Sequence, residues 1–299
     1  MRKIFGVVAV VLGSFLLVAA ALGQFWAPSK AERTPLDVNT TTRLSGSAAK
    51  LDATSGQVQN VKVKASSVNK TDSHKSTAHV VSFVETTCLV VDKGNVPDCV
   101  AANDPQDRLI SATTDVFATD RHTAESVPGK QYTTSKAVPH VGLVNKWPFD
   151  AQRKAYQFWD TTLVKAVPAK YAATEAVDGL RTYRYDVNVP TTDAEVLQGV
   201  QGKYSTTSSI WIEPRTGAII KQQQHQVRTQ ANGDPLLDLH LTYTDATIKA
   251  AADDARSSIS SLRMVTQVVP IAGLVGGVVL LVLGLFLLLG GRRRGAHVT

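Results

Sequence analysis

The sequence predicts a mostly β protein: a large twisted antiparallel sheet, or two sheet lobes, flanked by two transmembrane helices. Three observations lead to this prediction: an uncharged apolar run near each end of the chain, alternation of apolar and polar residues in the middle, and turn signals between the alternating stretches. About 20 apolar residues can cross a bilayer as a helix, and period-two alternation is typical of strands with one buried face.

The two apolar runs carry their positive charge on the terminal side. Arg2 and Lys3 precede the run from Ile4 to Leu22, and Arg292–Arg294 follow the run from Val268 to Gly290. Basic residues next to a span favour the cytoplasmic side. We therefore expect a plasma-membrane protein with both termini in the cytoplasm and an extracytoplasmic central domain.

This topology divides the chain into five parts. They are an N-terminal transmembrane helix (1–26), an exported β-rich domain (27–244), an amphipathic stalk helix (245–264), a C-terminal transmembrane helix (265–291) and a basic cytoplasmic tail (292–299). The first span can also be interpreted as a cleavable signal peptide, although its apolar run is longer than the usual signal core of about 7–15 residues. Both interpretations export the middle of the chain.

The positive net charge of +7 belongs mostly to the ends. Five of the 32 basic residues flank the two spans, and the other 27 face 25 acids. A nucleic-acid-binding domain carries its basic residues on one folded face. We therefore expect no nucleic-acid partner.

The chain has two cysteines, Cys88 and Cys99, and both fall in the exported part. An oxidising compartment favours a disulfide between them, and two free buried thiols are the alternative. Neither CxxC nor HExxH occurs, and the seven histidines are scattered, so we expect no metal site and no cofactor. His122 and His140 are interpreted as surface or turn residues.

Alternation is clear in RTYRYDVNVP and again from Leu237 to Tyr243. The segment from Lys221 to Gln230 is polar on both faces, which favours an edge strand and leaves the lining of a wet cavity as the alternative. Residues Ile248, Ala252, Ala255, Ile259 and Leu262 recur at helical spacing, and Asp245 is a plausible N-cap for the stalk helix.

One stretch, KWPFDAQRKAYQFWD, concentrates the aromatic residues of the chain. Such residues are the main source of core burial in a sheet protein. The alternative is an apolar groove whose basic residues meet the head group of a lipid or glycolipid, and catalysis is the weakest interpretation. The candidate ligand-binding residues are Lys146, Trp147, Phe149, Arg153, Lys154, Tyr156, Phe158 and Trp159.

An ordered set of motifs carries a family resemblance. The segments PLDVNTTTRLSG, VFATDRHT, WPF with YQFWD, and IWIEPRTGAIIK lie in that order between the two spans. With this ordered set of motifs, the chain resembles an actinobacterial envelope family that was first catalogued as a domain of unknown function and is also labelled the PorA porin family. The resemblance implies an exported β-rich domain and, through relatives, a link to trafficking of envelope glycolipids. The phrase WIEPRTGAIIK also resembles the half-barrel sheet of periplasmic lipoprotein carriers, which is an analogy of fold.

No set of catalytic residues stands out, because neither GxSxG nor a Walker A loop is present. The leading hypothesis is a non-enzymatic, membrane-anchored envelope protein that binds lipid or glycolipid, or scaffolds envelope-assembly membrane proteins. A structural protein without a ligand is the second hypothesis, with Gly273 and Gly277 packing against the first span. A porin-like pore subunit is the third, although the short strands, polar on both faces, do not suit a transmembrane barrel.

Overall fold

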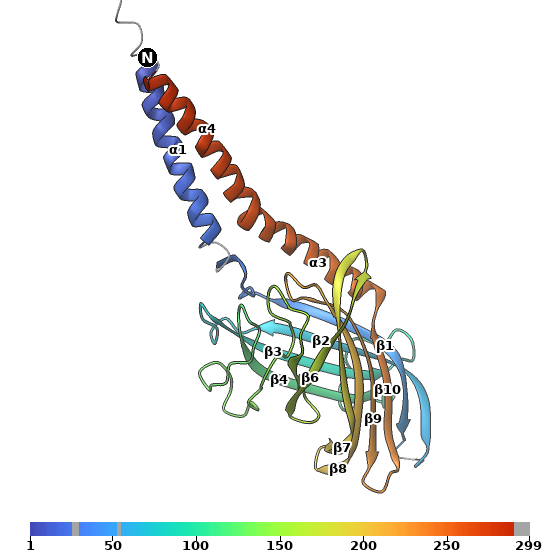
Figure 1. Ribbon diagram of the computed structural model, residues 1–299. Coiled ribbons are helices and arrows are strands. Elements are labelled where there is room, and N and C mark those ends of the chain that lie inside the picture. Colours follow the sequence, from blue (N-terminus) through green and yellow to red (C-terminus); the bar gives the residue numbers. More distant parts are fainter. Residues whose placement is uncertain (26–29, 53–54, 290–299) are drawn as a thin grey trace, which may run out of the picture. The chain divides into compact units, whose positions relative to one another are not determined.

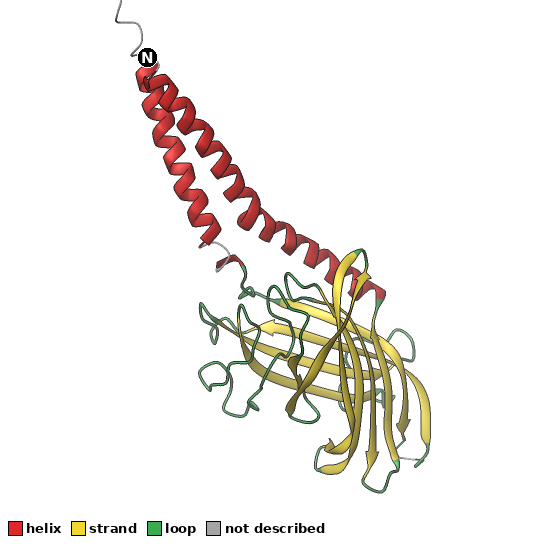
Figure 2. Cartoon of the chain, in the orientation of Figure 1, coloured by secondary structure: helices red, strands yellow, loops and turns green. Residues whose placement is uncertain are grey.

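The computed structural model describes residues 1–25, 30–52 and 55–289, so the predicted tail 292–299 lies outside the described residues. The chain divides into two compact units. One contains the N-terminal residues up to Arg33 together with the chain from Ser257 onward, and the other is the β domain, Thr34–Arg256. Figure 2 shows that the first unit is helical and that strands make up most of the second.

Ten strands of the described chain form one antiparallel sheet, in the order β4-β3-β2-β1-β10-β9-β8-β7-β6-β5. This confirms the predicted large antiparallel sheet, in its one-sheet form and not as two lobes. Figure 1 shows the sheet curling back on itself into a half-barrel. The strands are β1 (Asn39–Leu51), β2 (Val58–Thr71), β3 (Val80–Val91), β4 (Leu109–Asp120), β5 (Tyr156–Asp160), β6 (Lys165–Val177), β7 (Leu180–Leu197), β8 (Val200–Ile212), β9 (Ile219–Gln230) and β10 (Pro235–Tyr243).

The alternation of β7 sets which face of the sheet is inner. Tyr185, Val187 and Val189 are buried, whereas Asn188 and Pro190 between and after them are exposed. Directly paired residues of neighbouring antiparallel strands point to the same side of a sheet. The inner face therefore continues from Val187 through its partners on β8, β9, β10 and β1.

The loop between β4 and β5 joins the two edge strands. Leu143 donates its amide to Gln157 of β5 at 2.8 Å and accepts the amide of Trp159 at 2.7 Å. On the other side, Ser126, which is bridged to β4, donates its amide to Gly142 at 2.9 Å. Exposed strand edges invite pairing with other chains, and these loop contacts cover part of both edges.

Two clusters on the inner face make up most of the core. The larger one is built on β6, β7 and β8 and includes Tyr185, Val196, Ile210 and residues from the loop before β5. The smaller one, around Val63, is built from β1, β2, β3 and β10. Burial of these large side chains supplies the main driving force for closing the sheet.

The polar segment from Lys221 to Gln230 forms β9, which lies between β8 and β10. The prediction of an edge strand is therefore wrong. The inward side chains of this strand are polar and find partners inside the sheet: Arg228 donates to the carbonyl oxygen of Val196 at 2.9 Å and to the hydroxyl of Thr162 at 3.2 Å. Hydrogen bonding offsets the cost of burying such groups, so a polar strand can occupy a central position.

Helix α3 (Asp245–Arg263) follows β10, as the helical spacing predicted. Its N-cap is Thr244, whose hydroxyl accepts the amide of Thr247 at 3.2 Å, so the cap lies one residue before the predicted Asp245. The apolar side of the helix packs Ala252 and Ala255 against Ile220. A π-helical turn, η1 (Met264–Val268), then leads into α4 (Val269–Leu289).

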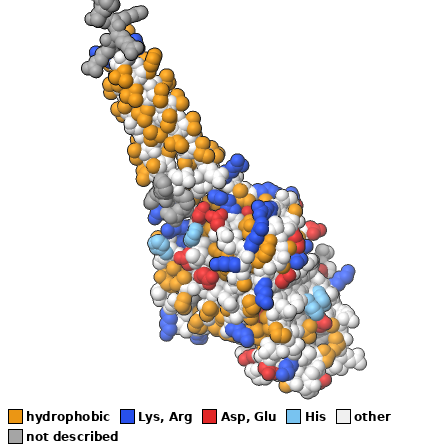
Figure 3. Space-filling model, in the orientation of Figure 1, with side chains coloured by type: hydrophobic (Ala, Val, Ile, Leu, Met, Phe, Trp, Pro, Cys, Tyr) orange, Lys and Arg blue, Asp and Glu red, His pale blue; other side chains and the backbone are white. Residues whose placement is uncertain are grey.

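The helical unit pairs α1 (Arg2–Phe25) with α4, and both helices are long and apolar enough to cross a membrane. Figure 3 shows that hydrophobic side chains cover the visible face of this pair, whereas charges of both signs are mixed over the β domain. Glycines bring the two helix backbones together: a Cβ on Gly13 would lie 2.8 Å from the carbonyl oxygen of Gly277, and one on Gly284 would lie 2.9 Å from that of Gly6. This close approach is typical of small-residue packing between membrane helices.

Cys88 and Cys99 form a disulfide, with their Cα atoms 5.5 Å apart, which confirms the predicted pairing. Cys88 is buried in β3, and the bond holds the loop after that strand. In the same loop, Asp98 forms an ion pair of 2.7 Å with Arg43 of β1. The guanidinium of Arg43 holds the pKa of the Asp98 carboxyl below its usual value.

Candidate functional site

Three motifs that lie far apart in the sequence meet at the aromatic block. Trp147 donates its amide to Gly217 at 2.9 Å, and Ala151 donates to Pro214 at 2.8 Å, so the block is bonded to the turn after β8. On the other side, the rings of Phe149 and His122 stack with centroids 5.9 Å apart. The WPF, EPRTG and TDRHT segments therefore form one packed unit.

The large aromatic residues of the block point into the core. The side chain of Trp147 is fully buried, with its ring centroid 5.2 Å from those of Phe158 and Tyr185. Tyr156 and Trp159 are 9% and 6% exposed. These contacts match the core interpretation, because Trp147 and Trp159 are both buried.

The remaining candidates of the block lie nearer the surface. The ammonium of Lys146 lies 3.6 Å from the centroid of the Phe149 ring and 3.1 Å from the hydroxyl of Thr34, and burial lowers its pKa to about 7. Arg153 and Lys154 are exposed, with their charged groups 5.2 Å from the ring centroids of Tyr183 and Tyr156 respectively. Phe149 and Phe158 are partly exposed. Ligand binding by these residues stays a prediction.

The inner face between β3 and β4 holds a small acidic cluster. Ser67 donates its hydroxyl to Glu85, and burial raises the pKa of the Glu85 carboxyl. His140 is 5% exposed and its Nε2 lies 2.8 Å from Asp115 Oδ2, so the expectation of a surface or turn histidine is wrong. Because the serine is bonded to Glu85 and the histidine to Asp115, Ser67 and His140 are not arranged as a nucleophile and its base.

A polar depression of about 670 Å³ lies on the outer face of the sheet, across the middle of β1, β10, β9, β8 and β7. Most of its lining side chains carry hydroxyl, amide or imidazole groups, and none of the described residues that line it is Lys or Arg. Such a surface offers many hydrogen-bond donors and acceptors to a polar ligand. The lining residues are Ser45, Gly46, Ser47, Asp186, Val187, Asn188, Thr207, Ser208, Ser209, Gln223, Gln224, His225, His240, Leu241 and Thr242.

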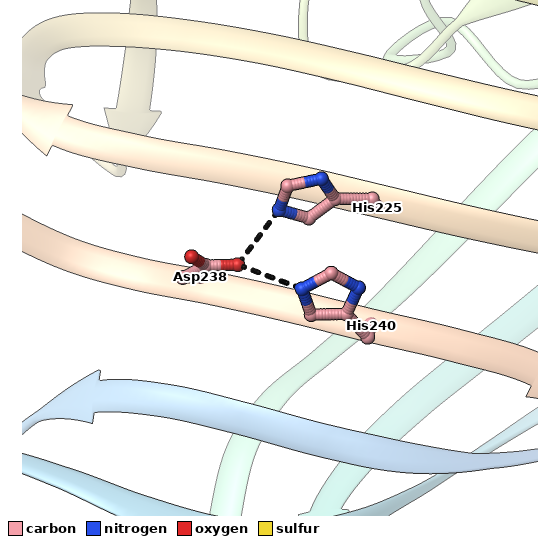
Figure 4. Close-up of side chains that lie close together, drawn as sticks. All are labelled: His225, Asp238 and His240. Atoms are coloured by element: carbon pink, nitrogen blue, oxygen red, sulfur yellow. Dashed lines mark hydrogen bonds and ion pairs between the residues drawn. The ribbon is translucent and has the colours of Figure 1, made fainter.

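Three side chains at this depression converge on one point (Figure 4). His225 Nε2 lies 2.8 Å from Asp238 Oδ1, and His240 Nε2 lies 3.4 Å from the same oxygen. The two imidazole rings are stacked, with centroids 3.9 Å apart and planes 10° apart. The ligand atoms of all three residues lie within 4.8 Å of one another, which is the spacing of a metal site.

The comparison with known families gives a match over nearly the whole chain. The family described as "Porin PorA" matches residues 5–286, which include most of both apolar helices and the complete sheet. The chain belongs to the PorA porin family. This confirms the resemblance drawn from the ordered motifs.

A relative named "Porin PorA", from Corynebacterium amycolatum, is 27% identical to this PorA-family chain over 94 residues. The match covers 27% of the chain and 24% of that relative, so the chain spans about a quarter of the length of the curated protein it matches. Family membership and the two apolar helices together support association with a membrane and a porin-like envelope protein.

Proposed function

We propose that this PorA-family protein is anchored in the plasma membrane by two helices and carries its β domain on the extracytoplasmic side, where the domain binds a glycolipid and takes part in envelope assembly without catalysis. The main support for the anchoring is the close contact between α1 and α4, which we call the helix seam. At Gly13 and Gly277 each helix leaves room for the backbone of the other, so a Cβ on either glycine would collide. A cleavable signal peptide has no need of such a fit, which supports a retained first span.

Two further features support the same topology. Basic residues flank both spans on the terminal side, which favours cytoplasmic termini. The disulfide between Cys88 and Cys99 suits an oxidising compartment. Both features are independent of the helix seam.

The polar depression supports recognition of a sugar head group. Asn188, Thr207, Gln223 and Ser47 place amide and hydroxyl groups on one open surface, and sugars bind through many such hydrogen bonds. An acyl chain needs apolar area instead, at about 0.8 kcal/mol per buried methylene. We therefore propose that this surface meets the head group of a glycolipid and not its acyl chains.

The topology is tested in intact cells with a membrane-impermeant maleimide. Lys170→Cys lies on an exposed position of β6, and Thr299→Cys lies in the tail. We expect labelling of Lys170→Cys in intact cells and of Thr299→Cys only after lysis. Intact-mass measurement should show that the purified chain retains residues 1–25. A mature chain that begins near Gly23, or the reverse labelling, contradicts the proposed topology.

The helix seam is tested by Gly277→Leu, with Gly276→Leu as the matched control. A Cβ on Gly276 has its nearest neighbour at 3.7 Å, whereas one on Gly277 lies 2.9 Å from backbone and side chain of α1. We expect Gly277→Leu to lower the thermal midpoint of the full chain in detergent and Gly276→Leu to leave it nearly unchanged. Equal effects would show that the seam is not what holds the helices.

The ligand is tested by native mass spectrometry of the full chain extracted in polymer nanodiscs. We expect co-purifying glycolipid, lost in the double variant Asn188→Leu/Thr207→Val and kept in Arg153→Ala/Lys154→Ala. The opposite pattern would move the binding surface to the aromatic block between residues 146 and 160. Absence of glycolipid in every variant would leave the assembly role without a ligand.

A porin-like pore is the second candidate, because the family match covers nearly the whole chain. Its sheet would be an unusual membrane barrel, since outward residues such as Ser47, Asp238 and His240 are polar where a lipid-facing barrel carries an apolar band. A pore would then have to come from helices of several copies. The test is ion conductance of the purified chain in planar bilayers. Conductance that Gly277→Leu abolishes would favour the pore over the proposed binding role.

A further inference from the structure

We propose that His225, Asp238 and His240 bind a divalent transition-metal ion, with Zn²⁺ as the ion that fits best. The proposal is independent of the anchoring and glycolipid roles argued above. It rests on the register of β9 and β10, on the distances between ligand atoms, and on the chemistry of the surrounding surface.

The register places the three side chains together. His225 of β9 pairs directly with His240 of β10, and Asp238 precedes His240 by two residues. Residues two apart on one strand share a face, and so do directly opposed residues of neighbouring strands. All three side chains therefore rise from the outer face of the same two rigid central strands. A site built on strands holds its ligands more firmly than one built on a loop.

The distances lie near those around a tetrahedral ion. Bonds from Zn²⁺ to imidazole nitrogen and carboxylate oxygen are about 2.0–2.2 Å, so two ligand atoms of a tetrahedron lie about 3.3–3.5 Å apart. The separation of His240 Nε2 and Asp238 Oδ1 is 3.4 Å, and that of His225 Nε2 and the same oxygen is 2.8 Å. One separation already fits, and the other needs an opening of about half an ångström. Because the nitrogen lone pairs lie in the ring planes, the two stacked imidazoles must also turn about their side-chain torsions to face a common ion.

The chemistry of the three groups also points to zinc. Two imidazoles and one carboxylate form a set that borderline divalent ions prefer, whereas Mg²⁺ and Ca²⁺ prefer oxygen ligands alone. Imidazole binds metal through a ring nitrogen, and the Nε2 atoms of both rings lie on the side of Asp238. The carboxylate of Asp238 supplies the negative charge.

The surroundings admit an ion from solvent and leave it an open position. The side chains of His225, Asp238 and His240 are 40%, 47% and 58% exposed. No lysine or arginine is among the described residues that line the adjoining depression, so no fixed cation opposes metal binding there. With three protein ligands, the fourth position faces this depression, where water or a hydroxyl of a ligand can complete the tetrahedron.

The test uses the full chain without a histidine tag, purified in detergent and dialysed against a chelator. Titration with ZnCl₂ followed by calorimetry should give one ion per chain, and CoCl₂ should give the visible absorption of a tetrahedral site. We expect His225→Gln and His240→Gln each to weaken binding at least about tenfold, and Asp238→Asn to weaken it as well. CaCl₂ and MgCl₂ should not displace the bound ion.

The matched control is His74→Gln/His79→Gln, which removes two exposed histidines elsewhere on the domain. This variant should bind zinc like the unchanged chain, and unchanged thermal midpoints of all metal-free variants would show that they are folded. Zinc binding that survives the loss of both His225 and His240, or no binding by the unchanged chain at millimolar zinc, overturns the proposal. If the His225 and His240 variants do not fold, the cobalt spectrum of Asp238→Asn tests the proposal. A change in the visible absorption supports Asp238 as a metal ligand, and an unchanged spectrum overturns the proposal.

Discussion

Trp147 donates its backbone amide to the carbonyl oxygen of Gly217 at 2.9 Å, and the two residues lie in motifs 70 positions apart. Gly217 has a positive φ of 73°, and a Cβ placed on it would collide with the carbonyl group of Trp147. The glycine in the EPRTG turn therefore serves the packing of the aromatic block. Packing against each other is a structural role for both motifs that needs no ligand.

Gly217→Ala should destabilise the protein more than the same change at Gly199 or Gly233. All three glycines have positive φ, but a Cβ on Gly199 or Gly233 would meet nothing within 4 Å. Left-handed backbone alone costs an alanine about 1–2 kcal/mol, and the clash at Gly217 should add at least about 1 kcal/mol. Urea unfolding followed by tryptophan fluorescence measures the difference. Equal losses at the three positions would mean that the turn moves away from Trp147 at little cost.

The burial of Trp147 predicts a large loss of stability on truncation. Trp147→Ala should lower the free energy of unfolding by about 3–5 kcal/mol, because it leaves a cavity between Phe158 and Tyr185. Arg153→Ala, at an exposed position of the same block, should stay within about 0.5 kcal/mol. Both values come from chemical denaturation of the full chain in detergent. A mild effect of Trp147→Ala would argue that the indole lines a space that a ligand normally fills.

Loss of the disulfide should weaken the β domain measurably. Closing a loop of this length contributes about 2–3 kcal/mol in the chain-entropy account, so Cys88→Ser/Cys99→Ser should lose that amount. The unchanged chain treated with a reductant should lose the same amount, while the double variant should not respond to the reductant. A response of the variant to the reductant would show that the reagent acts elsewhere.

Much of the fold follows from sequence periodicity, because one buried face imposes period two on a strand. The stretch from Tyr183 to Val189 and the stretch from Leu237 to Tyr243 became β7 and β10 with their apolar residues facing inward. The polar strand β9 could not be placed by the same rule. Its inward Arg228 is satisfied by Val196 and Thr162, and those partners are defined only by the closed sheet.

The cluster of His225, Asp238 and His240 was missed for a more specific reason. Next to the turn at Asn232–Asp234, Thr229 pairs with Pro235. If this register continued without a bulge, His225 would lie opposite Leu239. A bulge between Pro235 and Leu237 shifts the register by one residue, so His225 faces His240 instead. One extra residue in a strand moves every later side chain to the other face relative to its partner, and the sequence carries no clear signal for it.

The pKa of Lys146 predicts a stability that changes with pH. Burial lowers this pKa to about 7 from the usual 10.5, so between these two values the unfolded chain holds a proton that the folded chain lacks. The free energy of unfolding therefore rises as pH increases from about 7 towards 10.5. Below pH 7 the folded chain bears the full cost of burying the charged ammonium. The shift alone sets an upper limit of roughly 4–5 kcal/mol, and partial exposure reduces the expected effect to roughly 1–3 kcal/mol.

Lys146→Met removes the titrating group and keeps most of its length. We expect this variant to be more stable than the unchanged chain at pH 6.5, with the advantage shrinking at pH 8.5 and gone only well above pH 10.5, where the unchanged lysine is neutral in both states. Lys154→Met, at an exposed position, should follow the unchanged chain throughout. Thermal unfolding of the three proteins in detergent measures these differences. A constant offset between Lys146→Met and the unchanged chain across this range would show that the lysine stays charged when folded, held by the ring of Phe149.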